Sequence, residues 1–211
     1  MYGTVEKGSG YLFSSAELRD LIDSRRSALR QEVEQMNANQ LLNTSPADLA
    51  RYLVEKYSWF APSLKRDDWS ATEQEAQIDI RHDPNRWIDD RSRPCLVPGQ
   101  RIEIEVPAEG DVDLFYVRAN TSSSMPPRAQ IRRNSIFLTF DLAQDAQQRD
   151  IKQEAEKVLG NIEQHLGWLK DDLSTYNQSL PAQAEQAIAD RRRRTRANQG
   201  RAASLGIPLK G

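Results

Sequence analysis

The sequence predicts an α+β protein, because three patterns of apolar residues follow one another along its 211 residues. The first and last thirds repeat apolar side chains at helical spacing, whereas the middle third alternates them with polar ones, as a half-buried strand does. We therefore expect an N-terminal helical section over residues 1–72, a small antiparallel sheet or sandwich over 73–143, and a long helical hairpin with a connector over 144–211.

Two helices are predicted in the N-terminal section. Ser14 and Glu17 have the spacing of a capping box, in which a hydroxyl and a carboxylate bind free backbone N–H groups at a helix start. Ser45 followed by Pro46 supplies an N-cap and a preset first residue for a second, shorter helix. The aromatic residues in and near the following loops are interpreted as internal packing, with a ligand pocket or a protein contact as the alternative: Trp59, Phe60, Trp69 and Trp87.

The middle section reads as strands with one wet face. Ile102, Ile104 and Val106 alternate with charged residues, and the turn residues after Val106 predict a hairpin to a second strand over 112–119. A further strand is expected within 131–142. With the alternation around residue 78, at least four strands are predicted, in a mostly antiparallel sheet.

The strongest pattern in the chain is an apolar seam after residue 154, with steps of four and three residues that keep one face toward a partner helix. Pro181 is expected to end this helix and to begin an antiparallel return. The partner of the seam is either the same chain or a second copy. The candidate interface residues are Leu159, Ile162, Leu166, Leu169, Leu173 and Tyr176.

Four consecutive arginines, Arg191, Arg192, Arg193 and Arg194, form a candidate anion-binding cluster, since guanidinium groups bind phosphates in a bidentate manner. Consecutive residues of a helix point in all directions, however, and acidic residues lie nearby. We favour a solvated, salt-bridged helix end, with an anionic partner as the alternative.

Composition limits the function classes. A formal net charge of -2 argues against a protein that coats nucleic acid, which needs a dominant positive field. The single cysteine, Cys95, excludes internal disulfides and a cysteine-built zinc site, which fits a reducing cytoplasm. No apolar run approaches the roughly 20 residues that span a bilayer, so we expect no membrane partner.

No residue pattern predicts catalysis. His82 beside Asp83 lacks the further ligands of a hydrolytic metal site, and Glu103 with Glu105 on one strand face is more typical of a solvated surface than of a nuclease. Glycine-rich phosphate loops and nucleophile motifs are absent from the sequence. We expect no catalytic residue, no metal and no cofactor.

Residues 96–107 and the tail around Tyr176, Ile188 and residues 205–208 are similar to a region of many uncharacterised bacterial proteins. The resemblance covers about residues 49–209. In that group the region precedes a variable effector, such as a TIR-like or restriction-endonuclease-like domain, in a layout suggestive of antiphage defence. The present chain stops at Gly211, where an effector would begin, so the effector is expected to be an attached part of a longer protein or a separate protein.

The sequence thus leads to one hypothesis and one alternative. The hypothesis is a non-catalytic, cytoplasmic sensor or scaffold of a bacterial defence protein, which recognises a partner or ligand through its β section, couples this to an effector and possesses a seam suited to homo-oligomers. The alternative is a nucleic-acid-binding module that uses the arginine cluster, for which affinity should fall steeply with salt.

Overall fold

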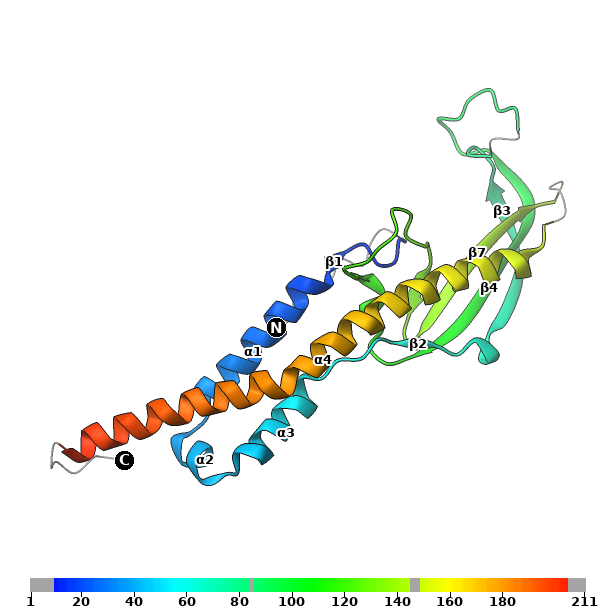
Figure 1. Ribbon diagram of the computed structural model, residues 1–211. Helices are drawn as coiled ribbons and strands as arrows, with labels where there is room; N and C mark the ends of the chain where they lie inside the picture. Colours follow the sequence, from blue (N-terminus) through cyan, green and yellow to red (C-terminus); the bar gives the residue numbers. More distant parts are fainter. Residues whose placement is uncertain (1–9, 84–85, 145–148, 205–211) are drawn as a thin grey trace. The chain divides into compact units, whose positions relative to one another are not determined.

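The computed structural model describes residues 10–83, 86–144 and 149–204, and it confirms the α+β class (Figure 1). The chain divides into two compact units. The β unit comprises residues 1–16 and 61–168, and the helical unit comprises residues 17–60 and 169–211. Each unit combines two separate stretches of chain, which differs from the three consecutive sections expected from the sequence.

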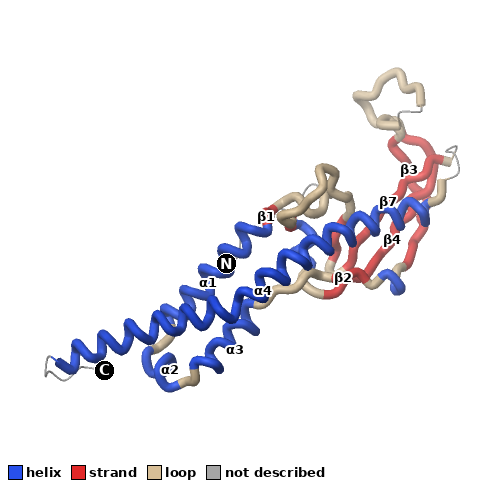
Figure 2. Tube along the Cα trace, viewed as in Figure 1, coloured by secondary structure: helices blue, strands red, loops and turns tan. Residues whose placement is uncertain are grey.

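The β unit is built on an antiparallel sheet centred on β4 (Leu96–Glu109) (Figure 2). One edge of β4 pairs with β2 (Ser63–Leu64) and then, after the 3₁₀ turn η1 (Arg66–Asp68), with β3 (Ser70–Asp79). The other edge pairs with β7, which is followed outward by β6. The ranges of these two strands are Ser135–Ala143 for β7 and Gln130–Arg132 for β6.

The register places the apolar residues of the sheet on one face. Ile104 lies opposite Leu138 on β7, and Val106 lies opposite Ile136. All four side chains are buried. The alternation seen in the sequence is therefore confirmed for β4 and β7, because these strands have one face in the core and one in water. On the wet face, Glu103 forms an ion pair with Arg132 (2.8 Å).

The predicted hairpin strand over 112–119 is wrong. Residues Val112–Tyr116 form a 3₁₀ helix, η2, and the short strand β5 (Val117–Arg118) pairs with β1 (Ala16–Glu17) instead of β4. The physical reason is that Leu114 and Phe115 are adjacent and both fully buried, which a strand with one wet face cannot achieve.

The first helix, α1, spans Leu18–Gln35 with Glu17 at its N-cap, so it begins three residues later than a cap at Ser14 predicts. The backbone there has another partner, since the Ser15 N–H donates to the Tyr116 carbonyl (2.9 Å). The short helix α2 (Ala38–Asn43) was not predicted. The second predicted helix is confirmed as α3 (Pro46–Tyr57), with Ser45 at the N-cap and proline in the first turn.

The predicted hairpin break at Pro181 is also wrong, because α4 is one helix over Ile151–Ser204. A proline inside a helix removes a hydrogen bond and costs about 3 kcal/mol. Leu180, Ala184 and Ile188 are nevertheless all buried, so the apolar stripe continues through the proline. Burial of a leucine or isoleucine contributes about 1.5–3 kcal/mol, which together offset that cost. The apolar strip at 205–209 lies outside the described residues.

Helix α4 contributes to both units. Its residues up to Trp168 belong to the β unit, and those from Leu169 belong to the helical unit. Across the described residues, no helix is both long and apolar enough to cross a membrane.

Candidate functional site

The six candidate interface residues are buried within the single chain, at 0–7% exposure. Leu159, Ile162 and Leu166 lie in the β unit, and the other three lie in the helical unit. Tyr176 also donates its hydroxyl to the Tyr57 carbonyl (3.1 Å). Of the two partners that the sequence left open, the structure favours the same chain, because these side chains are already covered. The predicted interface with a second copy stays without support.

The arginine cluster is occupied by contacts within the helical unit. Arg192 donates to the Leu41 carbonyl (2.8 Å) and to the Thr44 carbonyl, both at the C-terminal end of α2. Arg194 pairs with Glu34, whose carboxylate also lies 3.9 Å from Arg191, and Arg193 pairs with Asp190. This geometry favours the salt-bridged helix end over the anion site, since each guanidinium group has a partner in its own chain.

Polar side chains in the helical unit also bind one another. Glu32 accepts hydrogen bonds from Lys56 (2.8 Å), Tyr57 (2.7 Å) and Tyr52 (3.0 Å). Burial acts to raise the pKa of Glu32, but these three donors outweigh it and hold that pKa below its ordinary value. The Asn177 amide accepts from the Trp59 N–H (3.0 Å) and donates to the Trp59 carbonyl (2.8 Å).

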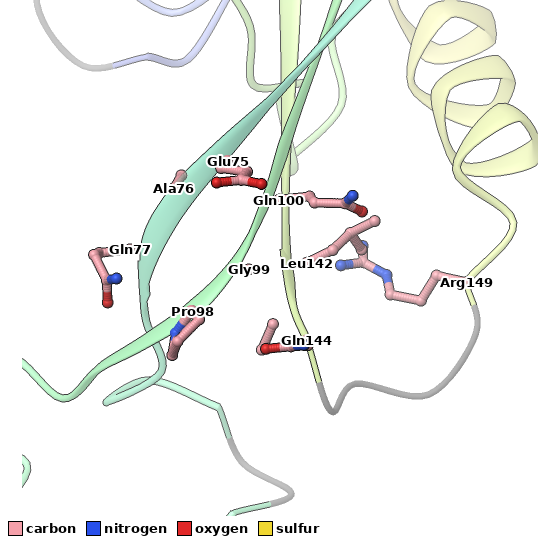
Figure 3. Close-up of a pocket in the computed structure, with 10 residues that line it drawn as sticks. Glu75, Ala76, Gln77, Pro98, Gly99, Gln100, Leu142, Gln144 and Arg149 are labelled. Atoms are coloured by element: carbon pink, nitrogen blue, oxygen red, sulfur yellow. The ribbon is translucent and has the colours of Figure 1, made fainter.

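The β unit contains a cavity of about 690 Å³ at the end of its sheet (Figure 3). Strands β3, β4 and β7 form its wall, and Arg149 extends toward Leu142 from the segment that precedes α4. The lining mixes carboxylate, amide and apolar groups. Its members are Glu75, Ala76, Gln77, Pro98, Gly99, Gln100, Leu142, Ala143, Gln144 and Arg149.

Two features position this wall. Arg149 is held by Glu154 (2.9 Å from Nε), and this bond raises the pKa of Arg149 and lowers that of Glu154. At Gly99, a Cβ atom would lie 2.2 Å from the Leu142 carbonyl oxygen and 2.7 Å from an Ile78 side-chain carbon. Glycine is therefore required for β4 to approach β7 this closely.

Strand β3 borders the cavity and forms the outer edge of the sheet. Among the strands that the structure describes, it pairs with β4 and with no other. Residues 70–75 are all exposed. Glu73 and Glu75 lie on the same face as Ile102 and Gln100, their partners on β4. The sequence missed this edge, because a strand exposed on both faces lacks apolar alternation; the run of small and polar residues before Ile78 was the available signal.

The loop between β3 and β4 is held by its own side chains. Arg91 donates to the carbonyls of Arg81 (3.0 Å), Asp83 (3.2 Å) and Arg86 (2.9 Å). The loop presents Trp87 at 93% exposure, and Phe60 of the helical unit is 69% exposed. The interpretation of these two aromatics as internal packing is therefore wrong, because neither ring is covered.

A buried histidine lies in the β unit. His165 is 1% exposed and stacks on Phe13 at a centroid distance of 4.7 Å, with Trp168 at 4.8 Å edge-on. Neither ring nitrogen has a hydrogen-bond partner. Burial lowers the pKa of His165, because the charged form would lose its hydration. The neutral ring thus acts as an apolar plate in the core.

His82 and Asp83 are not part of a larger donor set. In the described part of the chain, no group of three histidine, cysteine or acidic residues is placed to hold a metal ion. Asp79, near the same loop, instead accepts from the backbone N–H groups of Arg81 and Cys95 (both 3.1 Å) and thereby closes the loop base.

Comparison with known proteins adds no assignment: no family model, no curated protein and no solved structure matches this chain.

Proposed function

We propose that this chain is a non-catalytic scaffold that binds a partner through its β unit and couples this binding to its helical unit through α4. The observation that carries the proposal is the continuity of α4. Helix residues 151–168 belong to one unit and residues from 169 to the other, without a break between Trp168 and Leu169.

The buried stripe supports this role. Leu159 and Ile162 are fully buried on the β-unit part of α4, and Leu169 and Leu173 are buried on the other part. A helix whose hydrogen bonds run through both parts changes its position or stability as one element. Any partner that stabilises the first part therefore has a direct covalent and hydrogen-bonded route to the second.

The β unit is the proposed recognition part, because it carries the exposed edge of β3 and the cavity beside it. The helical unit is the proposed output part, which acts on an attached or separate effector. The same proposal includes the bacterial defence setting and sensor role that the sequence resemblance implies, and the cytoplasmic location that the single cysteine favours.

The test uses hydrogen exchange on the full chain carrying Leu159→Ala. The loss of the buried Leu159 side chain should speed amide exchange along α4 past Trp168 and into α1, because the two parts of the helix open together. Glu156→Ala, at an exposed position one turn earlier, is the matched control and should change little. If the faster exchange of Leu159→Ala stops before Leu169, the coupling proposal is wrong.

A further inference from the structure

We propose that the outer edge of β3 binds an extended, basic peptide segment of a partner protein, which adds to the sheet as a new strand. This inference rests on the proposed function, in which the β unit recognises a partner, and it names the chemical class of that partner. Its basis is the backbone of β3, the register of β3 on β4, and the charge of the β3 side chains.

The backbone of β3 offers the first requirement. The strand is 10 residues long, and each residue from Ser70 to Asp79 is in register with a residue of β4 between Glu105 and Leu96. Its second edge faces no described strand. An edge of this length presents alternating N–H and C=O groups, which an added strand satisfies with main-chain hydrogen bonds.

Proteins usually protect such an edge from other chains. The common devices are a very short strand, proline, charged side chains (lysine above all), or a bulge that interrupts the ladder. Residues 70–79 contain no proline and no lysine, and their register with β4 is continuous over the whole strand. The backbone of this edge is therefore regular enough to pair with another strand. The choice of partner has to come from the side chains.

The charged side chains of β3 are acidic, so they would select a partner segment of positive charge. The strand contains three acidic residues, Glu73, Glu75 and Asp79, and no basic residue. Asp79 is paired with Arg81 (2.8 Å), whereas the ion pairs among described residues leave out Glu73 and Glu75. Two unpaired carboxylates two residues apart on one strand face disfavour pairing of β3 with a second copy, because like charges would meet across the new ladder.

The same geometry specifies the partner. A strand added to β3 would place side chains at two-residue intervals opposite Glu73 and Glu75, and Glu75 also lines the cavity (Figure 3). Lysine or arginine at those two positions forms cross-strand ion pairs. The intervening residues would lie beside Thr72 and Gln74 on the opposite face, where threonine and other β-branched residues fit an exposed strand.

The probe is a nine-residue peptide of alternating threonine and lysine, titrated onto the full chain by fluorescence anisotropy. We expect saturable binding, with increased amide protection confined to residues 70–79 in hydrogen exchange. The same peptide with every backbone N–H methylated keeps its charges but cannot add to a sheet, and should bind at least tenfold more weakly. Equal binding of both peptides would overturn the proposal.

Charge is tested by reversing two exposed residues, Glu73→Lys with Glu75→Lys, which should weaken the unmodified peptide at least tenfold. The control, Glu156→Lys with Glu185→Lys, makes the same change in net charge on exposed positions of α4 and should leave binding within twofold. Equal loss in both double variants, protection of residues outside β3, or dimers of the unmodified chain that pair through β3 would each contradict the inference.

This experiment reads the edge of β3 directly, so its result is separate from exchange along α4. Peptide binding at β3 together with a local response to Leu159→Ala would refute the coupling function and leave the edge site standing. Faster exchange past Trp168 in Leu159→Ala without peptide binding would refute the edge site and leave the coupling function standing.

Discussion

The arginine cluster of the helical unit and the outer strand of the β unit differ in how their polar groups are engaged. In the helical unit, Arg192 binds the carbonyls at the end of α2, Arg194 binds Glu34, and Glu32 collects three donors. In the β unit, the outer edge of the 10-residue strand β3 pairs with no described strand, and neither ring nitrogen of the buried His165 has a hydrogen-bond partner. Abundance of charge is therefore a poor guide to a binding site: the four arginines contact groups of their own chain, whereas Glu73 and Glu75 of β3 are in no ion pair among the described residues.

The largest loss of stability is expected when a buried leucine of the helical unit is truncated. Leu173 is 1% exposed, so Leu173→Ala should lower the free energy of unfolding by about 2–5 kcal/mol, measured in urea. The neighbouring exposed substitution Lys170→Ala should stay within about 0.5 kcal/mol. The mass in solution should not change, because the leucine is covered by its own chain. A smaller mass for Leu173→Ala than for the unmodified protein would show that the seam joins two copies.

A pair of glycine substitutions examines the β unit with opposite signs. Gly99→Ala should destabilise by about 1–3 kcal/mol, because the new Cβ would overlap the Leu142 carbonyl and Ile78. Gly167→Ala meets open space on a helix and should stabilise by roughly 0.5–1 kcal/mol. Thermal unfolding of both variants measures the difference. If Gly99→Ala is neutral, the close approach of β4 and β7 is incorrect.

An element could be predicted from the sequence where a single buried face fixes the spacing of its apolar residues. The strands β4 and β7 and the long seam of α4 were predicted, because their core residues recur at regular intervals. The turn at Val112–Tyr116 was not, because tertiary burial of Leu114 and Phe115 overrides strand alternation. The helix end expected at Pro181 does not occur, because burial of apolar residues on both sides of the proline outweighs its low helix propensity.

The candidate site was harder to predict than the fold. The six seam residues and the four arginines stood out because they are repetitive, yet repetition reflects packing and solvation here. The edge of β3 depends on which strand lies outermost, and the close approach at Gly99 depends on the register between β4 and β7. Both are long-range properties that no local pattern in the sequence encodes.

A smaller loss of stability is expected for substitutions in the arginine cluster. Arg192→Ala leaves two helix-end carbonyls without their donor and should cost about 1–2 kcal/mol in urea unfolding. Arg193→Ala, whose side chain is 77% exposed, should cost almost nothing. An anion-binding cluster would behave differently: both variants would keep full stability and both would weaken binding of a DNA probe in a salt-dependent manner.

The pH dependence of His165 gives the smallest effect. Because burial lowers its pKa in the folded state, the unfolded chain binds the proton more readily, and stability falls as pH drops below about 6.5. The loss should approach about 1.4 kcal/mol for each pH unit at most. His165→Phe should remove this slope between pH 7.5 and 5.5 in urea titrations. An unchanged slope in that variant would assign the pH response to other groups.

The proposed coupling requires that α4 join the two units into one cooperative system. Incorporation of fluorotryptophan places reporters in both, since Trp59 lies in the helical unit and Trp69 and Trp168 lie in the β unit. In a urea titration followed by fluorine NMR, we expect the signals of these three tryptophans to change at one common midpoint. Separate midpoints for Trp59 and Trp69 would show that the two units unfold independently and would contradict the proposed coupling.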